Sequence, residues 1–148
     1  MTAETYYRAA LERIKDAYLL HTEGHYTFAM YASGLAVECL LRAFRLLQDT
    51  SFDERHDLWQ LWKKTELANV RLGLTYQRIY ALMNAVHGLW RNSFRFVSIS
   101  ELHSQLRKSH SQHGMKNKIV KHDSKRLFDA AQELLQIGEH QWERLKKK

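Results

Sequence analysis

Apolar residues recur every three or four positions along most of this chain, which is the spacing of one face of an α-helix. Near Met1, for example, Tyr7, Leu11 and Ile14 form such a stripe. No segment shows the sustained alternation of apolar and polar residues that is typical of a half-buried strand. The pattern therefore predicts an all-α protein. The expected helices span Glu4–His21, Tyr26–Leu47, a short segment opened by His56, Thr75–Trp90, Ser98–Ser109 and Asp123–Leu145.

Local signals mark the ends of several predicted helices. Gly24 interrupts the first apolar stripe. Ser98 and Glu101 have the spacing of a capping box, and so do Ser51 and Glu54. Because four of the predicted helices are long, we expect an antiparallel bundle of four long helices with short connecting helices.

The composition fits a single helical domain over residues 1–148. The chain has no Pro and six Gly, so few residues interrupt its helices. The one cysteine, Cys39, excludes an internal disulfide and lies on an apolar face, where we expect plain packing. No basic-then-apolar signal opens the sequence, and no apolar run reaches the roughly 18 residues of a membrane span. We therefore expect a cytoplasmic protein with no membrane partner.

The formal net charge of +7 is unevenly distributed. Residues 1–62 carry six Lys and Arg against nine Asp and Glu, whereas residues 63–148 carry 17 against seven. Basic residues are densest between Arg107 and Arg126, a stretch that includes Lys116 and Lys118. Such a stretch attracts polyanions such as nucleic acid. The alternative is a solvated loop on a basic protein.

The segment from His87 to Phe96 combines aromatic rings, an amide and two guanidinium groups. Arg91, Asn92 and Arg95 could bind phosphates, and the rings beside them could stack on bases. The same groups could instead cap a helix and hold a loop against the core. Glu38 lies in the middle of an apolar helix and needs a partner if it points inward. Arg95 is one candidate for that partner, which would give the segment a purely structural role.

Other polar pairs have weaker chemical interpretations. His110 and His113, like His21 and His25, have a spacing that could bind a metal, but neither pair has enough nearby Cys or carboxylates to complete a site. His56 and Asp57 could act as an acid–base pair, although an Asp at a helix start is more often a cap. The sequence has no Gly-rich phosphate loop, which argues against kinase or dinucleotide-binding chemistry. We therefore expect no metal and no cofactor.

Three segments together resemble the HEPN (higher eukaryotes and prokaryotes nucleotide-binding) domains. The stretch Tyr26–Ala43, with Ala-Val-Glu followed by an Arg before Ala43, is similar to the family's second helix. His56-Asp-Leu follows it, and the segment Trp90–Phe96 looks like an Asn-x-x-Arg-aromatic element at the end of the third helix. The last predicted helix resembles the family's fourth helix in position and length.

This resemblance implies a bundle of four to five helices that usually forms a homodimer. Many members are metal-independent ribonucleases, in which an Arg is followed four to six residues later by a catalytic His. Arg91 and Asn92 begin such a motif at the matching place, but its His positions are occupied by residues that cannot take a proton. Those residues are Phe96, Val97 and Ser98. Elsewhere, Arg107 and His113 have the required spacing, with His113 as general acid or base and Arg107 stabilising the phosphate charge.

The sequence thus favours a HEPN-like module without the usual catalytic motif, which binds nucleic acid, a nucleotide or a protein in a prokaryotic defence or toxin–antitoxin system. Its binding residues would be Arg91, Asn92, Arg95, Lys116 and Lys118. One alternative is a metal-independent endoribonuclease toxin that uses Arg107 and His113. Another is a structural subunit with no nucleic-acid role. The resemblance also implies a nucleotidyltransferase or an antitoxin as a possible partner of the homodimer.

Overall fold

The computed structural model describes residues 1–52, 58–65, 74–107 and 116–148, and every regular element in those ranges is helical. The prediction of an all-α protein is therefore confirmed. The long helices are α1 (Ala3–Thr22), α2 (Tyr26–Gln48), α4 (Leu74–Leu89) and α6 (Lys116–Lys146). The short elements are α3 (Leu58–Lys63), the 3₁₀ helix η1 (Asn92–Phe96) and α5 (Ile99–Arg107).

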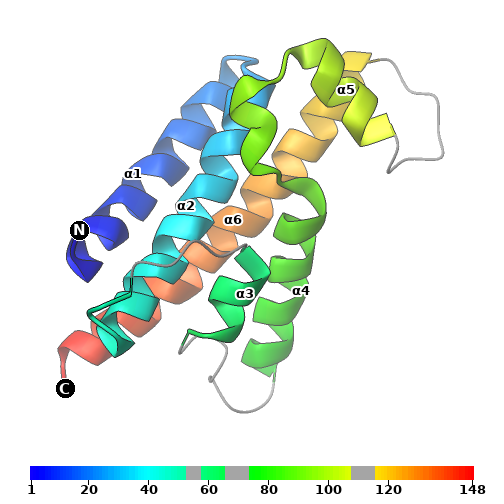
Figure 1. The fold of residues 1–148 in the computed structure, drawn as a ribbon. Coiled ribbons are helices and arrows are strands. Elements are labelled where there is room, and N and C mark those ends of the chain that lie inside the picture. Colours follow the sequence, from blue (N-terminus) through cyan, green and yellow to red (C-terminus); the bar gives the residue numbers. More distant parts are fainter. Residues whose placement is uncertain (53–57, 66–73, 108–115) are drawn as a thin grey trace.

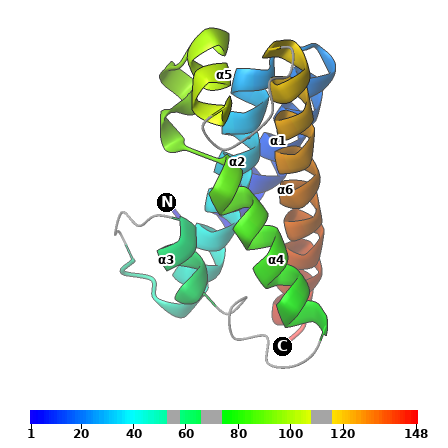
Figure 2. The same cartoon turned by 90° about the vertical axis from the view of Figure 1, so that its right-hand side faces the viewer.

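Helices α1 and α2 form an antiparallel hairpin, and α6 runs along both of them (Figure 1). The hairpin turns at Gly24, whose φ of +80° lies in the left-handed region that favours glycine. Helix α4 packs against α6, and α5 lies near the start of α6. In the view of Figure 2, α3 and the segment after α4 lie on the same side of α2.

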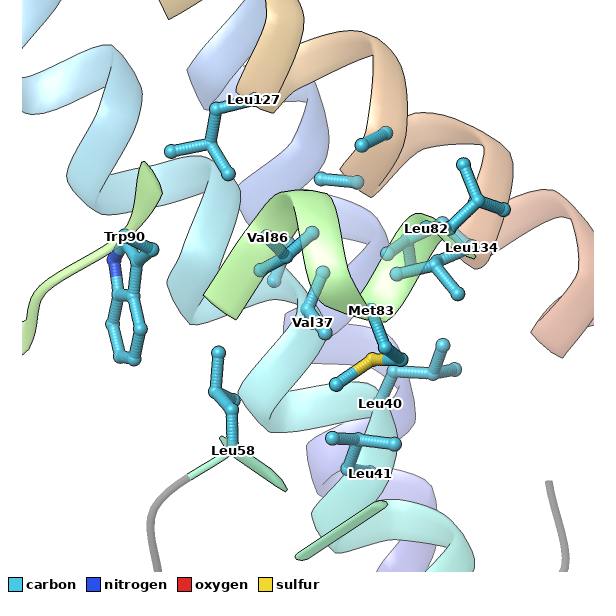
Figure 3. Packing of buried hydrophobic residues seen from close by; sticks show 14 of the residues in the cluster. Val37, Leu40, Leu41, Leu58, Leu82, Met83, Val86, Trp90, Leu127 and Leu134 are labelled. Carbon is cyan, nitrogen blue, oxygen red and sulfur yellow. The ribbon is translucent and has the colours of Figure 1, made fainter. Parts of the chain in front are cut away.

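The core is centred on α2, which contacts α1, α6, α3, η1 and α5. Figure 3 shows its side chains meeting those of α4 and α6. Among the described helices, α2 has the length and apolar composition of a membrane span, although 67 % of its most apolar window is buried inside the protein. Its apolar composition thus follows from its central place in the core. The labelled core residues of these helices include Val37, Leu40, Leu41, Met83, Val86, Leu127 and Leu134.

The end of α4 is fixed by a close contact with α2. Trp90 packs against the α2 backbone at Gly34, where an added Cβ would lie 2.1 Å from the indole ring. The indole Nε1 donates a hydrogen bond to the carbonyl oxygen of Tyr31 at 3.3 Å. A residue larger than glycine at position 34 would therefore displace Trp90, and with it the polar segment that begins at the next residue.

Most predicted helix ends agree with the structure to within a few residues, but two predictions were incomplete. The last helix begins at Lys116 rather than Asp123, because Val120 is buried one heptad before Leu127 and extends the same apolar face. Residues 92–96 form a 3₁₀ turn that the periodicity does not reveal. The Ser51–Glu54 capping box extends into residues outside the described ranges.

Candidate functional site

A cavity of about 770 Å³ is lined by residues of α2, α3, α4 and η1. Figure 2 shows α3 and the segment after α4 on one side of α2. We call this cavity the cleft. Its walls come from α2, the first residue of α3, the last turns of α4 and the 3₁₀ segment. Its lining residues are Tyr31, Leu35, Glu38, Arg42, Leu58, His87, Trp90, Arg91, Asn92 and Arg95.

The α2 wall is a single helical stripe. Tyr31, Leu35, Glu38 and Arg42 follow one another at steps of four, three and four, and all are partly buried. Glu38 accepts a hydrogen bond from Nε of Arg42 at 2.9 Å, so its charge is paired one turn along its own helix. The hypothesis that Glu38 pairs with Arg95 was therefore wrong, because a partner on the same helix stands closer.

Arg91 caps the end of α4. Its Nη1 donates hydrogen bonds to the carbonyl oxygens of His87 at 2.9 Å and Trp90 at 2.8 Å. Carbonyls at a helix C-terminus carry partial negative charge and favour a cation. One of the two interpretations of this segment, helix capping, therefore holds for Arg91. The cap engages one of three guanidinium nitrogens, which leaves Arg91 able to contact a ligand in the cleft.

Arg95 reaches back to the α2 wall. Its Nη1 lies 3.4 Å from both the Tyr31 hydroxyl oxygen and the Asn92 side-chain oxygen, at the long end of hydrogen-bond distance. Within the described part of the chain, neither Arg95 nor Arg91 has a carboxylate within 4.0 Å. The cleft thus holds three arginines and one carboxylate, which is already paired with Arg42. Its charge favours an anionic ligand.

The polar residues of the 3₁₀ segment face the surface because the ring of Phe94 anchors the segment in the core. Phe94 is 2 % exposed and packs into the core, and its backbone N–H donates to the carbonyl of Arg91 at 3.1 Å. Arg91 itself is extended, with φ −134° and ψ 136°, so α4 stops before it. Asn92, Arg95 and Phe96 are exposed as a result.

His87 is a cleft residue that the sequence analysis did not single out as a site. It is exposed on the last turn of α4, and its ring centre lies 5.6 Å from that of Trp59. The missed signal is its place in the sequence, since His87 lies four residues before Arg91 on the last turn of α4, and its carbonyl oxygen accepts a hydrogen bond from Arg91. The cleft therefore contains a histidine, although not at the positions expected from the family motif.

Of the other predicted site residues, the structure places the side chain of Lys118 alone. Lys118 is exposed on α6 and does not line the cleft. Arg107 ends α5 and Lys116 begins α6, but their side chains, like all of His113, lie outside the described part of the structure. Residues 116–126 of the basic stretch are helical rather than a loop.

His21, one half of a possible metal-binding pair, and Cys39, which was expected to pack in the core, both contact other parts of the fold. His21 shares a 2.9 Å hydrogen bond between its Nδ1 and the Oγ of buried Ser124. Cys39 is buried, and this burial raises the pKa of its thiol to about 11, so the thiol is unreactive near neutral pH. Among the described residues, no group of three or more His, Cys, Asp and Glu could hold a metal ion.

Comparison with known families gives one match. The family model of the HEPN domain matches residues 3–141, which is nearly the whole chain. No curated protein and no solved structure matches the sequence.

Proposed function

This chain belongs to the HEPN domain family, and on that premise we propose that its cleft binds the phosphates of a nucleic acid or nucleotide. The observation that carries the proposal is the pair Arg91 and Arg95, which line one cavity without a carboxylate partner among the described residues. Guanidinium groups bind phosphate oxygens through paired N–H donors. The apolar floor at Leu35 and Leu58 leaves room for a sugar or base.

The biological setting is a further part of the proposal. We infer a module that lacks the family's usual catalytic motif and works in a prokaryotic defence or toxin–antitoxin system, beside a nucleotidyltransferase or an antitoxin. The absence of His at positions 96–98 supports the first part of this inference, the loss of the motif.

A homodimer is also proposed. It is supported by an apolar groove of about 390 Å³ between α1 and α2, where Leu19 and Phe28 are exposed. This groove shares Tyr31 and Leu35 with the cleft, so a second copy bound there would border the ligand. Sedimentation of the Phe28→Glu variant checks it. We expect the wild-type protein to sediment as a dimer and the Phe28→Glu variant as a monomer. Equal sedimenting masses of the two proteins would contradict the proposed interface.

The phosphate-binding proposal is tested by the salt dependence of RNA binding. We expect Arg91→Gln and Arg95→Gln each to weaken binding of a labelled single-stranded RNA. Each lost phosphate contact should also reduce the slope of log affinity against log salt by about 0.7. Fluorescence anisotropy over a series of salt concentrations measures both quantities.

The matched control is Arg144→Gln, which removes the same charge from the exposed end of α6, away from the cleft. It should leave the affinity nearly unchanged. If all three variants lose affinity equally, binding depends only on net charge and the cleft is not the site. Melting temperatures of the Arg91 variant separate lost binding from a lost helix cap.

A second candidate function is favoured by His87, which lines the cleft with Arg91 and Arg95. In a metal-independent endoribonuclease, His87 would take the proton of a 2′-hydroxyl while the arginines stabilise the charge on the attacked phosphate. This arrangement is an alternative to the Arg107 and His113 pair expected from spacing. Cleavage of single-stranded RNA in a chelating buffer, abolished by His87→Asn but not by His113→Asn, would support it. No cleavage at high protein concentration would exclude it.

A further inference from the structure

Phe96 stands out on the surface beside the cleft. Its side chain is 76 % exposed, the largest value for an aromatic residue in the described part of the chain. Phe94, two residues earlier, is 2 % exposed and anchors the same short segment. Because the anchor fixes the backbone, Phe96 is held outward by a folded element. Exposing most of a phenyl ring costs hydrophobic free energy, which a ligand could recover.

A guanidinium group lies against this ring. The central carbon of Arg95 is 4.6 Å from the centre of the Phe96 ring and 5.9 Å from that of Tyr31. These distances are typical of cation–π contacts. Tyr31 and Arg95 both line the cleft, so the series Tyr31, Arg95, Phe96 leads from the cleft to the exposed ring.

We propose that Phe96, held by Arg95, is a base-stacking platform at the edge of the cleft, and that the ligand is therefore a single-stranded nucleic acid. This inference rests on the proposed phosphate-binding function. A phosphate bound by Arg91 and Arg95 places a neighbouring nucleotide within reach of Phe96, whose exposed surface accepts an unstacked base. A duplex keeps its bases paired and stacked, so its bases cannot reach the ring.

The experiment compares three labelled probes: a short oligoadenylate, an abasic oligomer of the same length and charge, and a blunt RNA duplex. We expect the wild-type protein to bind oligoadenylate more tightly than the other two. Phe96→Ala should weaken oligoadenylate binding by about 5- to 150-fold and leave abasic binding unchanged. Phe96→Leu should behave like Phe96→Ala, because it keeps an apolar side chain but loses the aromatic face, whereas Phe96→Trp should retain the affinity.

The control variant is Tyr18→Ala, which removes another exposed aromatic side chain, one that lies on α1 against Phe128. It should not change the affinity for any probe. If the wild-type protein binds none of the probes, the proposed function and the platform are both wrong. If it binds oligoadenylate and the abasic oligomer equally, and Phe96→Ala changes neither, the platform alone is wrong. If Phe96→Ala lowers the sedimenting mass while Phe96→Leu restores both mass and affinity, the ring belongs to a protein interface and the platform is overturned.

Discussion

At the scale of single residues, the contact between Gly34 and Trp90 connects the core to the cleft. The indole ring occupies the space that a Cβ at position 34 would fill. Trp90 is followed directly by Arg91, so a displaced ring would move the α4 cap as well. Stability and ligand binding therefore depend on the same small residue.

We expect Gly34→Ala to lower the free energy of unfolding by about 1–3 kcal/mol, because the added methyl group overpacks the contact with Trp90. The affinity of the cleft for RNA should fall too. Chemical denaturation measures the first effect and anisotropy the second.

Gly88→Ala is the matched control, since an added Cβ at this exposed position of α4 would meet nothing within 4 Å. It should stabilise the protein by about 0.5–1 kcal/mol through helix propensity. Equal stabilities of the two variants would show that position 34 tolerates a side chain and that the close contact is not a constraint.

At the scale of elements, α5 shows which features of this fold are readable from local sequence. The Ser98–Glu101 capping box forms as predicted: the backbone N–H of Glu101 donates to Ser98 Oγ at 3.2 Å, and that of Ser98 donates to the Glu101 carboxylate at 3.1 Å. All of its partners lie within four residues. The start of α6 was misplaced because Val120, which extends the apolar face by one heptad from Leu127, stands among basic and polar residues that weaken the stripe before Asp123.

The capping box yields a prediction at this scale. We expect Ser98→Ala to cost about 1 kcal/mol of stability, because the N–H groups at the start of α5 lose an acceptor. Thermal unfolding followed by circular dichroism measures it. Ser104→Ala, at an exposed position inside α5, should leave the stability unchanged or raise it slightly, because Ala has a higher helix propensity than Ser. The same change in stability in both variants would mean that the Ser98 cap does not stabilise α5.

At the scale of the whole molecule, the cleft was only partly predictable. Arg91, Asn92 and Arg95 could be found because they are nearly contiguous and follow an apolar helix. Tyr31 and Arg95 are 64 positions apart, and the packing of Trp90 and Phe94 into the core brings them together. Periodicity indicates which face of α2 is apolar but not which element covers it. The sequence predicted an arginine as the partner of Glu38 and offered Arg95, whereas the partner in the structure is Arg42, one turn away on the same helix.

A pH dependence also belongs to the whole molecule, since His21 joins the end of α1 to Ser124 of α6. Burial lowers the pKa of His21 below its usual value of 6.5, and Lys121 and Lys125 lower it further. The unfolded chain then binds a proton more readily than the folded chain below about pH 6.5. The contribution of neutral His21 to the free energy of unfolding is therefore fully present above that pH. It is lost as the pH falls through the lowered pKa of the folded protein.

We expect the melting temperature of the wild-type protein to fall more steeply below about pH 6.5 than that of His21→Asn, which keeps a polar group near Ser124 without a titratable ring. The exposed His140 supplies the control variant, His140→Asn, which should follow the wild-type curve. Parallel curves for wild type and His21→Asn would rule out His21 as the source of the acid sensitivity.

The contact between Trp90 and Gly34 has a consequence for the evolution of this fold. Neither residue can change alone without leaving a void or a clash, so substitutions at positions 34 and 90 should arise as compensating pairs. A relative with a larger residue at 34 should carry a smaller one at 90. In such a lineage the exit of the chain from α4 would be held differently, and the binding residues that follow it would be under relaxed selection.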